Sequence, residues 1–415
     1  MRGKSVKIFF VLLLALAAAA PARAQTPDDL RGAVIESEFI ATHAAADINR
    51  MIASFYPAEQ VLPARFAADE YRVRFGSLYQ KDQPIEILAQ VFIPRAEQPA
   101  EFPVFVMGAG STGLADKCAP SQERPAVQSW GNYKTFLLTI ATQGYIVIMP
   151  DYAGFNDPDR IQPYYVAEMA GRVLLDAGRA VYDLFASEAG YVQPENAAPL
   201  DVVFVAGYSQ GGQSVFAAKD LWAAYAPELP LAGIIGYAPV TNMQSHMLTL
   251  PQLTPYRLYA WADYYGADKV PLEEIFTDYW LPTLEDDVLN LCVMDAVGRF
   301  SANPAEMYRP AFLEALQNGT VGALFPELDK LLELNNPGFV QNDIPALIVQ
   351  GTEDRTLPMA VHERFVERYC AAGNRLTELV HAGVNHFNAR QVSYHEVLDW
   401  MQQIVGGQTP PQDCP

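Results

Sequence analysis

Residues 202–225 read VVFVAGYSQGGQSVFAAKDLWAAY and place a serine between two unlike stretches. Val202–Ala206 is apolar, which predicts a buried strand, and Gly212–Tyr225 has the periodicity of a helix. Ser209 lies between them in the glycine-rich sequence GYSQGG, residues 207–212. A reactive serine at a strained strand-to-helix turn needs small residues two positions before and after it, because larger side chains would overlap. Both positions are glycine, so Ser209 is the candidate nucleophile.

Strand and helix patterns alternate on both sides of this stretch. Such alternation implies parallel crossover units and therefore a doubly wound, mostly parallel α/β sheet. Apolar runs predict strands at 71–75, 85–93, 104–107, 145–149, 232–237, 346–350 and 376–380. Helical periodicity predicts helices at 128–142, 166–185, 359–372 and 389–404.

The alternation stops between Ala238 and Pro345, where aromatic residues are frequent and only helical stretches can be recognised. We therefore expect a mostly helical cap insertion over the C-terminal edge of the sheet, at 238–344. The other expected parts are a signal peptide at 1–24, an N-terminal arm at 25–70, a first core part at 71–237, and a second core part with the C-terminal tail at 345–415. Within the arm, residues 26–66 are predicted to be helical and loop-like.

The first residues have the three features of a secretory signal peptide. Basic residues up to Lys7 precede an apolar run from Ile8 to Ala20, and the small-residue sequence Ala22-Arg23-Ala24 follows. This predicts export, to a periplasm or out of the cell, with cleavage after Ala24. The apolar run is short for a membrane span, and no later stretch approaches 18 uncharged apolar residues, so stable membrane insertion is not expected.

Charge and missing motifs narrow the function. The formal net charge is −20, so no positive field attracts nucleic acid, and a neutral substrate is favoured. HExxH and GxxxxGK[ST] do not occur in the sequence, and no GxGxxG directly follows the first predicted strand, at 71–75, which predicts neither a catalytic metal nor a nucleotide cofactor. The four cysteines match no zinc motif and, in an exported chain, suggest two disulfides with three possible connectivities.

A serine nucleophile needs a base within hydrogen-bond reach and an acid that orients the base. The stretch GTEDRTLP, residues 351–358, follows a predicted strand and supplies acids at the same sheet edge as Ser209. We select Asp354, whose short side chain suits a rigid loop, and Glu353 is the alternative.

The base is expected on the loop after the last strand. His386 lies there in GVNHF, residues 383–387, just before the final helix, while His381 ends the strand itself and is the rival. His386 also completes the chain order serine, acid, histidine.

Two backbone N–H groups are expected to stabilise the oxyanion of a tetrahedral intermediate. The Gln210 amide follows the nucleophile at the start of a helix, where the helix dipole is positive. The second donor should come from GAGSTG, residues 108–113, after the strand 104–107. We select Ser111, with Gly110 and Thr112 as alternatives.

Several segments together resemble the secretory lipase family of α/β hydrolases, which includes fungal lipase A and exported bacterial relatives. Residues 109–113 with Asp116–Ser121 are similar to the family's HGTTG loop and CAPS segment, although Ala109 stands where relatives usually have histidine. The other similar segments are PDYAG at 150–154, LD and RA at 175–176 and 179–180, YAPEL at 225–229 and GTED at 351–354.

The resemblance implies an α/β-hydrolase fold, a helical cap over an acyl-binding cleft, and the disulfides Cys118–Cys292 and Cys370–Cys414. It also implies cleavage of carboxylic esters or lipids through a covalent acyl-enzyme on Ser209. The same residues could serve amide or peptide hydrolysis or acyl transfer, and a non-catalytic protein that binds an apolar ligand is the alternative from another class.

Overall fold

The computed structural model describes residues 27–124, 129–186, 191 and 196–414. The predicted signal peptide at 1–24 lies outside the described residues, as does Gln128, where the first predicted core helix begins. Among the described residues, no helix is both long and apolar enough to cross a membrane.

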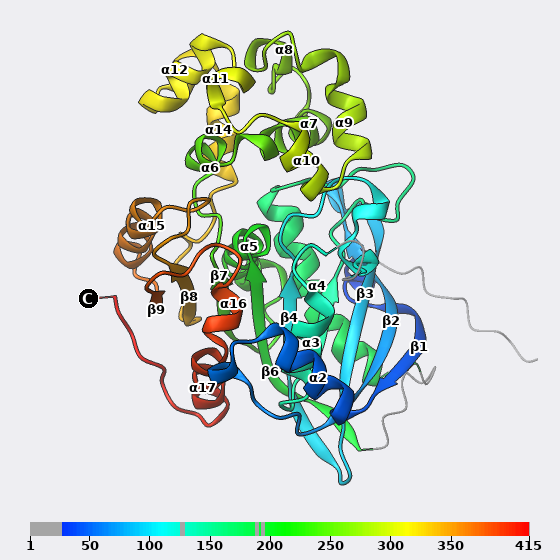
Figure 1. Ribbon diagram of the computed structural model, residues 1–415. Helices are drawn as coiled ribbons and strands as arrows, with labels where there is room; N and C mark the ends of the chain where they lie inside the picture. The colour runs from blue at the N-terminus through cyan, green and yellow to red at the C-terminus, as the bar shows by residue number, and fades with distance from the viewer. Residues whose placement is uncertain (1–26, 125–128, 187–190, 192–195, 415) are drawn as a thin grey trace, which may run out of the picture.

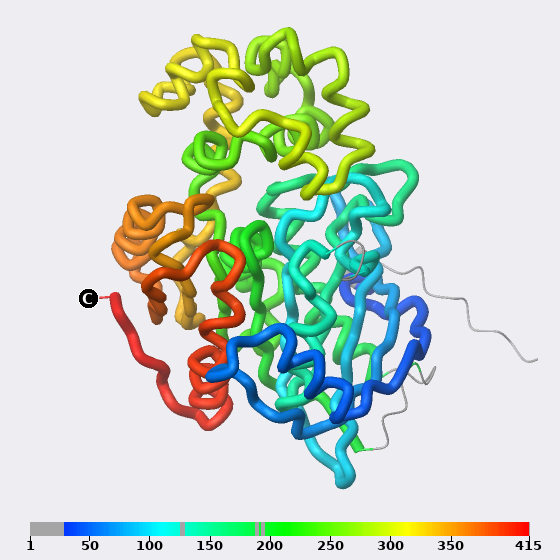
Figure 2. Tube along the Cα trace, viewed as in Figure 1, coloured from blue at the N-terminus to red at the C-terminus, as the bar shows by residue number. Residues whose placement is uncertain are grey.

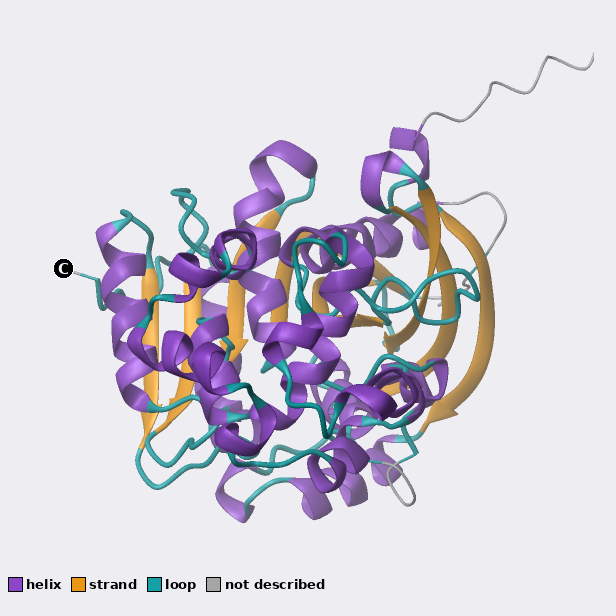
Figure 3. Cartoon of the chain, turned by 90° about the horizontal axis from the view of Figure 1, so that it is seen from above, coloured by secondary structure: helices purple, strands orange, loops and turns teal. Residues whose placement is uncertain are grey.

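The described chain is built on one nine-stranded sheet with the order β1-β2-β3-β5-β4-β6-β7-β8-β9 (Figure 1). The strands from β4 to β9 run parallel, while β1, β2 and β3 are antiparallel to their neighbours. Figure 3 shows that the sheet is strongly curved at the end opposite the C-terminus. The strands are β1 Val34–His43, β2 Ala67–Leu78, β3 Pro84–Arg95, β4 Ala100–Gly108, β5 Ile146–Pro150, β6 Ala197–Tyr208, β7 Leu231–Tyr237, β8 Ala346–Gly351 and β9 Leu376–His381.

One face of the parallel strands is covered by α3 (Tyr133–Ala141) and α17 (Tyr394–Val405). Phe136 of α3 packs on Phe105 of β4, with ring centroids 6.4 Å apart, and Trp400 of α17 packs on Phe204 of β6 at 6.1 Å. Phe105 and Phe204 are partners in the β4–β6 register, so both helices lie on the same face.

The opposite face carries α4 (Ala167–Ala186), α5 (Gln210–Tyr225) and α15 (Met359–Ala371). Side chains three residues apart along a strand point to opposite faces. A Cβ on Gly233 of β7 would meet Trp400 of α17, whereas one on Gly236 would meet Phe216 of α5. Both faces of the parallel strands are therefore buried, which explains their nearly continuous apolar sequences.

Between β7 and β8 the chain forms helices without a further strand of the sheet, and we refer to residues 238–344 as the cap. Figures 1 and 2 show these helices gathered above one end of the sheet, in green to yellow. The cap helices are α6 Met243–Thr249, α7 Thr254–Tyr265, α8 Leu272–Ile275, α9 Leu284–Asn290, α10 Val293–Arg299, α11 Pro304–Met307, α12 Pro310–Asn318, α13 Val321–Leu324 and α14 Pro326–Leu334.

The helical and loop-like prediction for residues 26–66 is wrong over Val34–His43. Short helices α1 (Pro27–Leu30) and α2 (Ala45–Phe55) are present, but β1 lies between them and pairs with β2 at the edge of the sheet. Most of its side chains are exposed or half-buried, and the strand lies at the edge of the sheet. The sequence of β1 therefore lacks the apolar alternation from which strands are predicted.

The predicted helix at 389–404 is divided into α16 (Ala389–Val392) and α17. Ser393 separates them, and its hydroxyl donates to the Ala389 carbonyl at 2.7 Å. Such a back-bond competes with the helical hydrogen bonds and favours a bend.

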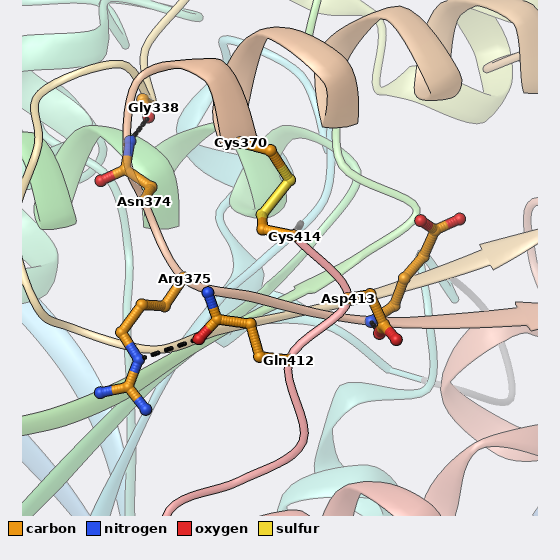
Figure 4. Close-up of a disulfide and its surroundings, with 8 residues drawn as sticks. Gly338, Cys370, Asn374, Arg375, Gln412, Asp413 and Cys414 are labelled. Carbon is orange, nitrogen blue, oxygen red and sulfur yellow. Dashed lines mark hydrogen bonds between the residues drawn. A yellow bond between two sulfur atoms is a disulfide. The ribbon is translucent and has the colours of Figure 1, made fainter.

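Both disulfides implied by the family resemblance are present. Cys118–Cys292 joins the loop after β4 to the cap, and Cys370–Cys414 joins α15 to the C-terminal tail (Figure 4). The tail also follows β9: the Asp413 amide donates to the Leu376 carbonyl at 2.8 Å, and the Glu378 amide donates to the Asp413 carboxylate at 2.7 Å. The tail thus covers the outer edge of β9.

Candidate active site

Ser209 occupies a strained turn between β6 and α5. Its backbone has φ 54° and ψ −108°, a conformation that residues with a side chain rarely adopt. A Cβ on Gly207 would lie 2.1 Å from the Gly211 carbonyl oxygen, and one on Gly211 would lie 2.0 Å from the Gly108 carbonyl oxygen. Glycine is therefore required at both positions, as the sequence pattern predicts, and the turn holds the serine at the carboxyl end of the sheet.

The structure brings Ser209, Asp354 and His386 together from three separate loops. Nε2 of His386 lies 3.0 Å from the Ser209 hydroxyl, and Nδ1 lies 2.7 Å from the Asp354 carboxylate. All three residues are between 4% and 7% exposed. An ionised Asp354 accepts from Nδ1–H, so the free lone pair of Nε2 faces the serine hydroxyl as a general base requires.

The position of the acid is fixed by backbone contacts. The Leu357 amide donates to Asp354 Oδ1 at 2.7 Å, which leaves Oδ2 for the imidazole. A Cβ on Gly351 would lie 2.1 Å from the Val384 carbonyl oxygen, so the acid loop and the histidine loop approach closely. Glu353, the alternative acid, is exposed.

The rival histidine has other partners. Nε2 of His381 lies 3.3 Å from the Glu396 carboxylate, on the side of α17. His43 pairs with Glu70 and His362 with Glu378, whereas His386 contacts the Ser209 hydroxyl.

The loop after β4 is braced by three tyrosine hydroxyls, one for each of three successive residues. Tyr152 donates to the Ala109 carbonyl at 2.6 Å, the Gly110 amide donates to the Tyr133 hydroxyl at 2.6 Å, and the Ser111 and Tyr164 hydroxyls are 2.5 Å apart. These bonds brace the loop although the Ala109 side chain cannot form a hydrogen bond.

The same bonds separate the candidates for the oxyanion donor. Because the Gly110 amide is already engaged by Tyr133, it is a poor donor for an oxyanion. Thr112 is 1% exposed and its carbonyl accepts from the Val293 amide, so this residue faces the cap. Ser111 and Gln210 remain the best candidates, and Gln210 is the first residue of α5.

Arg390 is a buried cation beneath the site that sequence reasoning missed. It is 2% exposed, and its guanidinium carbon lies 4.9 Å from the ring centre of Tyr133 and 4.8 Å from that of Tyr208. The Tyr208 ring in turn lies 5.1 Å from the His386 ring. Arg390 therefore supports both the loop after β4 and the imidazole; a lone arginine four residues after His386 gives no motif that would reveal this role.

Two of the segments that carry the family resemblance, residues 175–180 and residues 225–229, contact each other and have a structural role. The Tyr225 hydroxyl donates to the buried Asp176 at 2.8 Å, and Arg179 donates to the Tyr225 carbonyl at 2.6 Å. These bonds lock α4 against the end of α5. Asp151 of the PDYAG segment is also buried, and it accepts from the Ser121 amide and hydroxyl.

The described residues contain no group of three or more His, Cys, Asp or Glu side chains that could hold a metal ion. The residues gathered at the site offer a hydroxyl nucleophile, an oriented imidazole and backbone N–H donors.

Comparisons with known proteins identify the family and the fold of the chain. The model of a family described as secretory lipase matches residues 128–412, more than half of the 415-residue chain. A curated relative, the secreted triacylglycerol lipase LIP4 of Malassezia globosa, is 23% identical over 367 residues, which cover 83% of this chain and 73% of that protein.

Solved structures show the same fold. The ligand-bound esterase LipA of Xanthomonas oryzae, described as rice cell wall degrading, has a TM-score of 0.72 and 17% identity, covering 91% of this chain and 100% of that one. Candida antarctica lipase A in its closed state has a TM-score of 0.66 and 18% identity, covering 92% and 84%. The predicted α/β-hydrolase fold is thereby confirmed.

Proposed function

Because the chain belongs to the secretory lipase family, and is thus an exported carboxylic-ester hydrolase, we propose that it cleaves its substrates through a covalent acyl-enzyme on Ser209. Asp354 and His386 are the proposed acid and base, and the amides of Gln210 and Ser111 are the proposed oxyanion donors. The observation that carries this proposal is the contact of one imidazole with both the Ser209 hydroxyl, at 3.0 Å, and the Asp354 carboxylate, at 2.7 Å.

Acylation begins when the Ser209 oxygen attacks the ester carbonyl carbon. His386 takes the hydroxyl proton, and the carbonyl π electrons move onto oxygen, where the two amides stabilise the charge. Asp354 keeps the imidazole in the required tautomer and stabilises the imidazolium. When the intermediate collapses, the carbon–oxygen bond to the alcohol breaks and His386 donates its proton to that oxygen.

Deacylation repeats these steps with water. His386 removes a proton from a water molecule that attacks the acyl carbon, and it then returns a proton to Ser209 as the carboxylic acid leaves. The strained turn keeps the hydroxyl in place for both half-reactions, so little reorganisation precedes each attack.

The nucleophile is tested with Ser209→Ala and a fluorophosphonate probe, using nitrophenyl esters of increasing chain length. Turnover should fall by about 10⁶-fold and labelling should be lost. Ser54→Ala is the matched control, because Ser54 lies exposed on α2 and should leave labelling and turnover unchanged. Near-native hydrolysis by Ser209→Ala would refute the assignment.

The leaving group is proposed to be an alcohol. Turnover on an ester, an anilide of the same acid, and the ester in the presence of an acceptor alcohol compares hydrolysis of the two bond types with acyl transfer. Higher kcat/KM for the ester, with free acid as product, supports the proposal; anilide cleavage at an equal rate, or transfer to the alcohol as the dominant reaction, contradicts it.

We further propose that residues 1–24 direct export and are removed after Ala24. The basic, apolar and small-residue sequence of this segment supports the proposal, as do two disulfides, which persist in oxidising compartments. Intact-mass measurement of the exported protein should show a chain that begins at Gln25. A mature protein that retains the first 24 residues would contradict it.

A further inference from the structure

Tyr165 lies beside the loop that carries the proposed oxyanion donor. It stands just before α4, is 1% exposed, and has a backbone φ of 59°, which is uncommon for a residue with a side chain. Its ring packs against that of Tyr164, with centroids 4.5 Å apart, and the Tyr164 hydroxyl is 2.5 Å from that of Ser111. The strained backbone therefore brings a second phenol to the braced loop.

The Tyr165 hydroxyl is buried and has no hydrogen-bond partner of normal geometry among the described residues. Burial raises the pKa of the Tyr165 phenol, and this effect outweighs the lowering by the Arg257 charge and by the nearby hydroxyls of Ser111, Tyr164 and Ser209. The phenol therefore keeps its proton at neutral pH and is a hydrogen-bond donor next to the nucleophile. Buried tyrosine hydroxyls usually have a partner, so this one calls for an acceptor that arrives with the substrate.

A buried arginine of the cap strengthens this donor. The Arg257 guanidinium carbon lies 4.6 Å from the centre of the Tyr165 ring, and Arg257 is 0% exposed. Its guanidinium is held by the Met243 carbonyl at 3.0 Å and by Nδ1 of His246, both on α6. A cation over the ring withdraws electron density from the phenol, which makes its proton a better donor to an anion.

We propose that the Tyr165 hydroxyl is a third hydrogen-bond donor to the oxyanion of the tetrahedral intermediate, in addition to the Gln210 and Ser111 amides. The proposal rests on the proposed function of Ser209. During attack, the new bond forms between the Ser209 oxygen and the carbonyl carbon, the π electrons move onto the carbonyl oxygen, and His386 takes the serine proton. Tyr165 keeps its own proton throughout and only donates a hydrogen bond.

A donor of this kind differs from an ordinary structural hydroxyl in its effect on stability. A buried hydroxyl without a partner disfavours the folded state, so its removal should leave the protein equally or more stable. Removal of an oxyanion donor, by contrast, slows the chemical step by about 10²- to 10³-fold. The rate of the chemical step and the stability of the fold should therefore change independently, and this difference distinguishes a catalytic role from a packing role.

The test is Tyr165→Phe. We expect kcat/KM for nitrophenyl esters to fall by about 10²-fold or more, with an unchanged or higher Tm. Tyr256→Phe is the matched control: Tyr256 is buried in the cap and its hydroxyl donates to the Leu291 carbonyl at 2.8 Å, so its removal should lower Tm and leave kcat/KM near the wild-type value. A Tyr165→Phe protein with near-native kcat/KM would overturn the proposal.

Esters of one acid with alcohols of different pKa show which substrate oxygen accepts the hydrogen bond from Tyr165. A donor to the oxyanion should cause the same fall in kcat/KM for every alcohol. A fall confined to poor leaving groups would overturn the proposal, because it would place the phenol at the alcohol oxygen instead. In addition, a trifluoromethyl ketone, which forms a tetrahedral adduct with serine, should bind Tyr165→Phe more weakly by the factor lost in kcat/KM.

Failure of this proposal can be distinguished from failure of the proposed function. Fluorophosphonate labelling of Ser209 in Tyr165→Phe reports whether the nucleophile is still reactive. If Ser209→Ala is inactive and unlabelled while Tyr165→Phe retains full kcat/KM, the nucleophile assignment stands and the third donor is rejected.

Discussion

At the scale of single residues, the site depends on side chains whose orientation is fixed by backbone contacts. The Leu357 amide holds one oxygen of Asp354 and the imidazole takes the other. Asp354 therefore orients the His386 imidazole by accepting a hydrogen bond from its Nδ1–H group. Glu353, its neighbour in sequence, points into solvent and offers a direct comparison.

Asp354→Asn should lower kcat by about 10⁴-fold, because an amide cannot hold the imidazole in the tautomer that accepts the serine proton. KM should change little, since Asp354 is not expected to contact substrate. Glu353→Gln serves as the control and should remain within about twofold of wild type, because an exposed side chain without a role in the site tolerates neutralisation. Steady-state kinetics on a nitrophenyl ester measures both, and a similar loss in the two variants would reject the choice of Asp354.

Asp151 predicts a pH dependence of stability. Burial raises the pKa of its carboxyl from 3.8 to about 6, despite the hydrogen bonds from Ser121 and Asn156. Between these values the folded chain binds more protons than the unfolded chain, so this residue's contribution to the free energy of unfolding falls as pH rises.

The stability of wild type relative to Asp151→Asn should accordingly decrease between pH 4 and pH 6, and stay constant above that range. Denaturant melts at a series of pH values measure the difference. Asp201→Asn, at an exposed position, should show no such trend. A relative stability that rises with pH would contradict the expected direction.

At the scale of elements, the strand–turn–helix of β6 and α5 tolerates little change. Gly207→Ala should destabilise the protein by more than about 2 kcal/mol, because the new Cβ would lie 2.1 Å from the Gly211 carbonyl oxygen. Gly298→Ala in α10 is the control: nothing lies within 4 Å of its Cβ position, so alanine should stabilise the helix by up to about 1 kcal/mol. Thermal melts distinguish the two, and equal effects would refute the steric argument.

The predictable elements are those whose sequence is dictated by burial on both faces. The parallel strands are continuous apolar runs, and Ser209, Asp354 and His386 each follow the end of such a run, so their common edge could be deduced. β1 could not be predicted, because an exposed edge strand is specified by its pairing with β2 and not by its own pattern. The division of the final helix depends on a single hydroxyl, that of Ser393.

Much of the surroundings of the site could not be predicted, for a related reason. Tyr133, Tyr152 and Tyr164 brace three successive backbone positions, but tyrosine in a sequence looks the same whether it fills a core or holds a loop. Arg257 and Arg390 are buried cations stacked on aromatic rings, and arginine is ordinarily predicted to be exposed. Such contacts join residues that are distant in sequence, so they emerge only when the fold is known.

At the scale of the whole molecule, Cys118–Cys292 fastens the cap to the core. It spans 174 residues, against 44 for Cys370–Cys414, so loop entropy predicts a larger stabilisation, by about 1 kcal/mol. The double variant Cys118→Ser/Cys292→Ser should lose more free energy of unfolding in urea than Cys370→Ser/Cys414→Ser. It should also lose activity first on heating, because the cap is freed above the site. The reverse order would contradict this account.

The tail that runs along β9 has a consequence for where this chain can be produced. An uncovered edge strand exposes unpaired amides and carbonyls that can pair with a strand of another chain. Other copies of the same protein are the most available partners for such pairing. In a compartment that keeps thiols reduced, nothing covalent would hold Cys414 against α15, and the rim of the sheet could open to self-association. Export into an oxidising environment therefore also protects the protein from aggregation. Cytoplasmic overproduction should yield filaments or inclusion bodies more readily than secretion does.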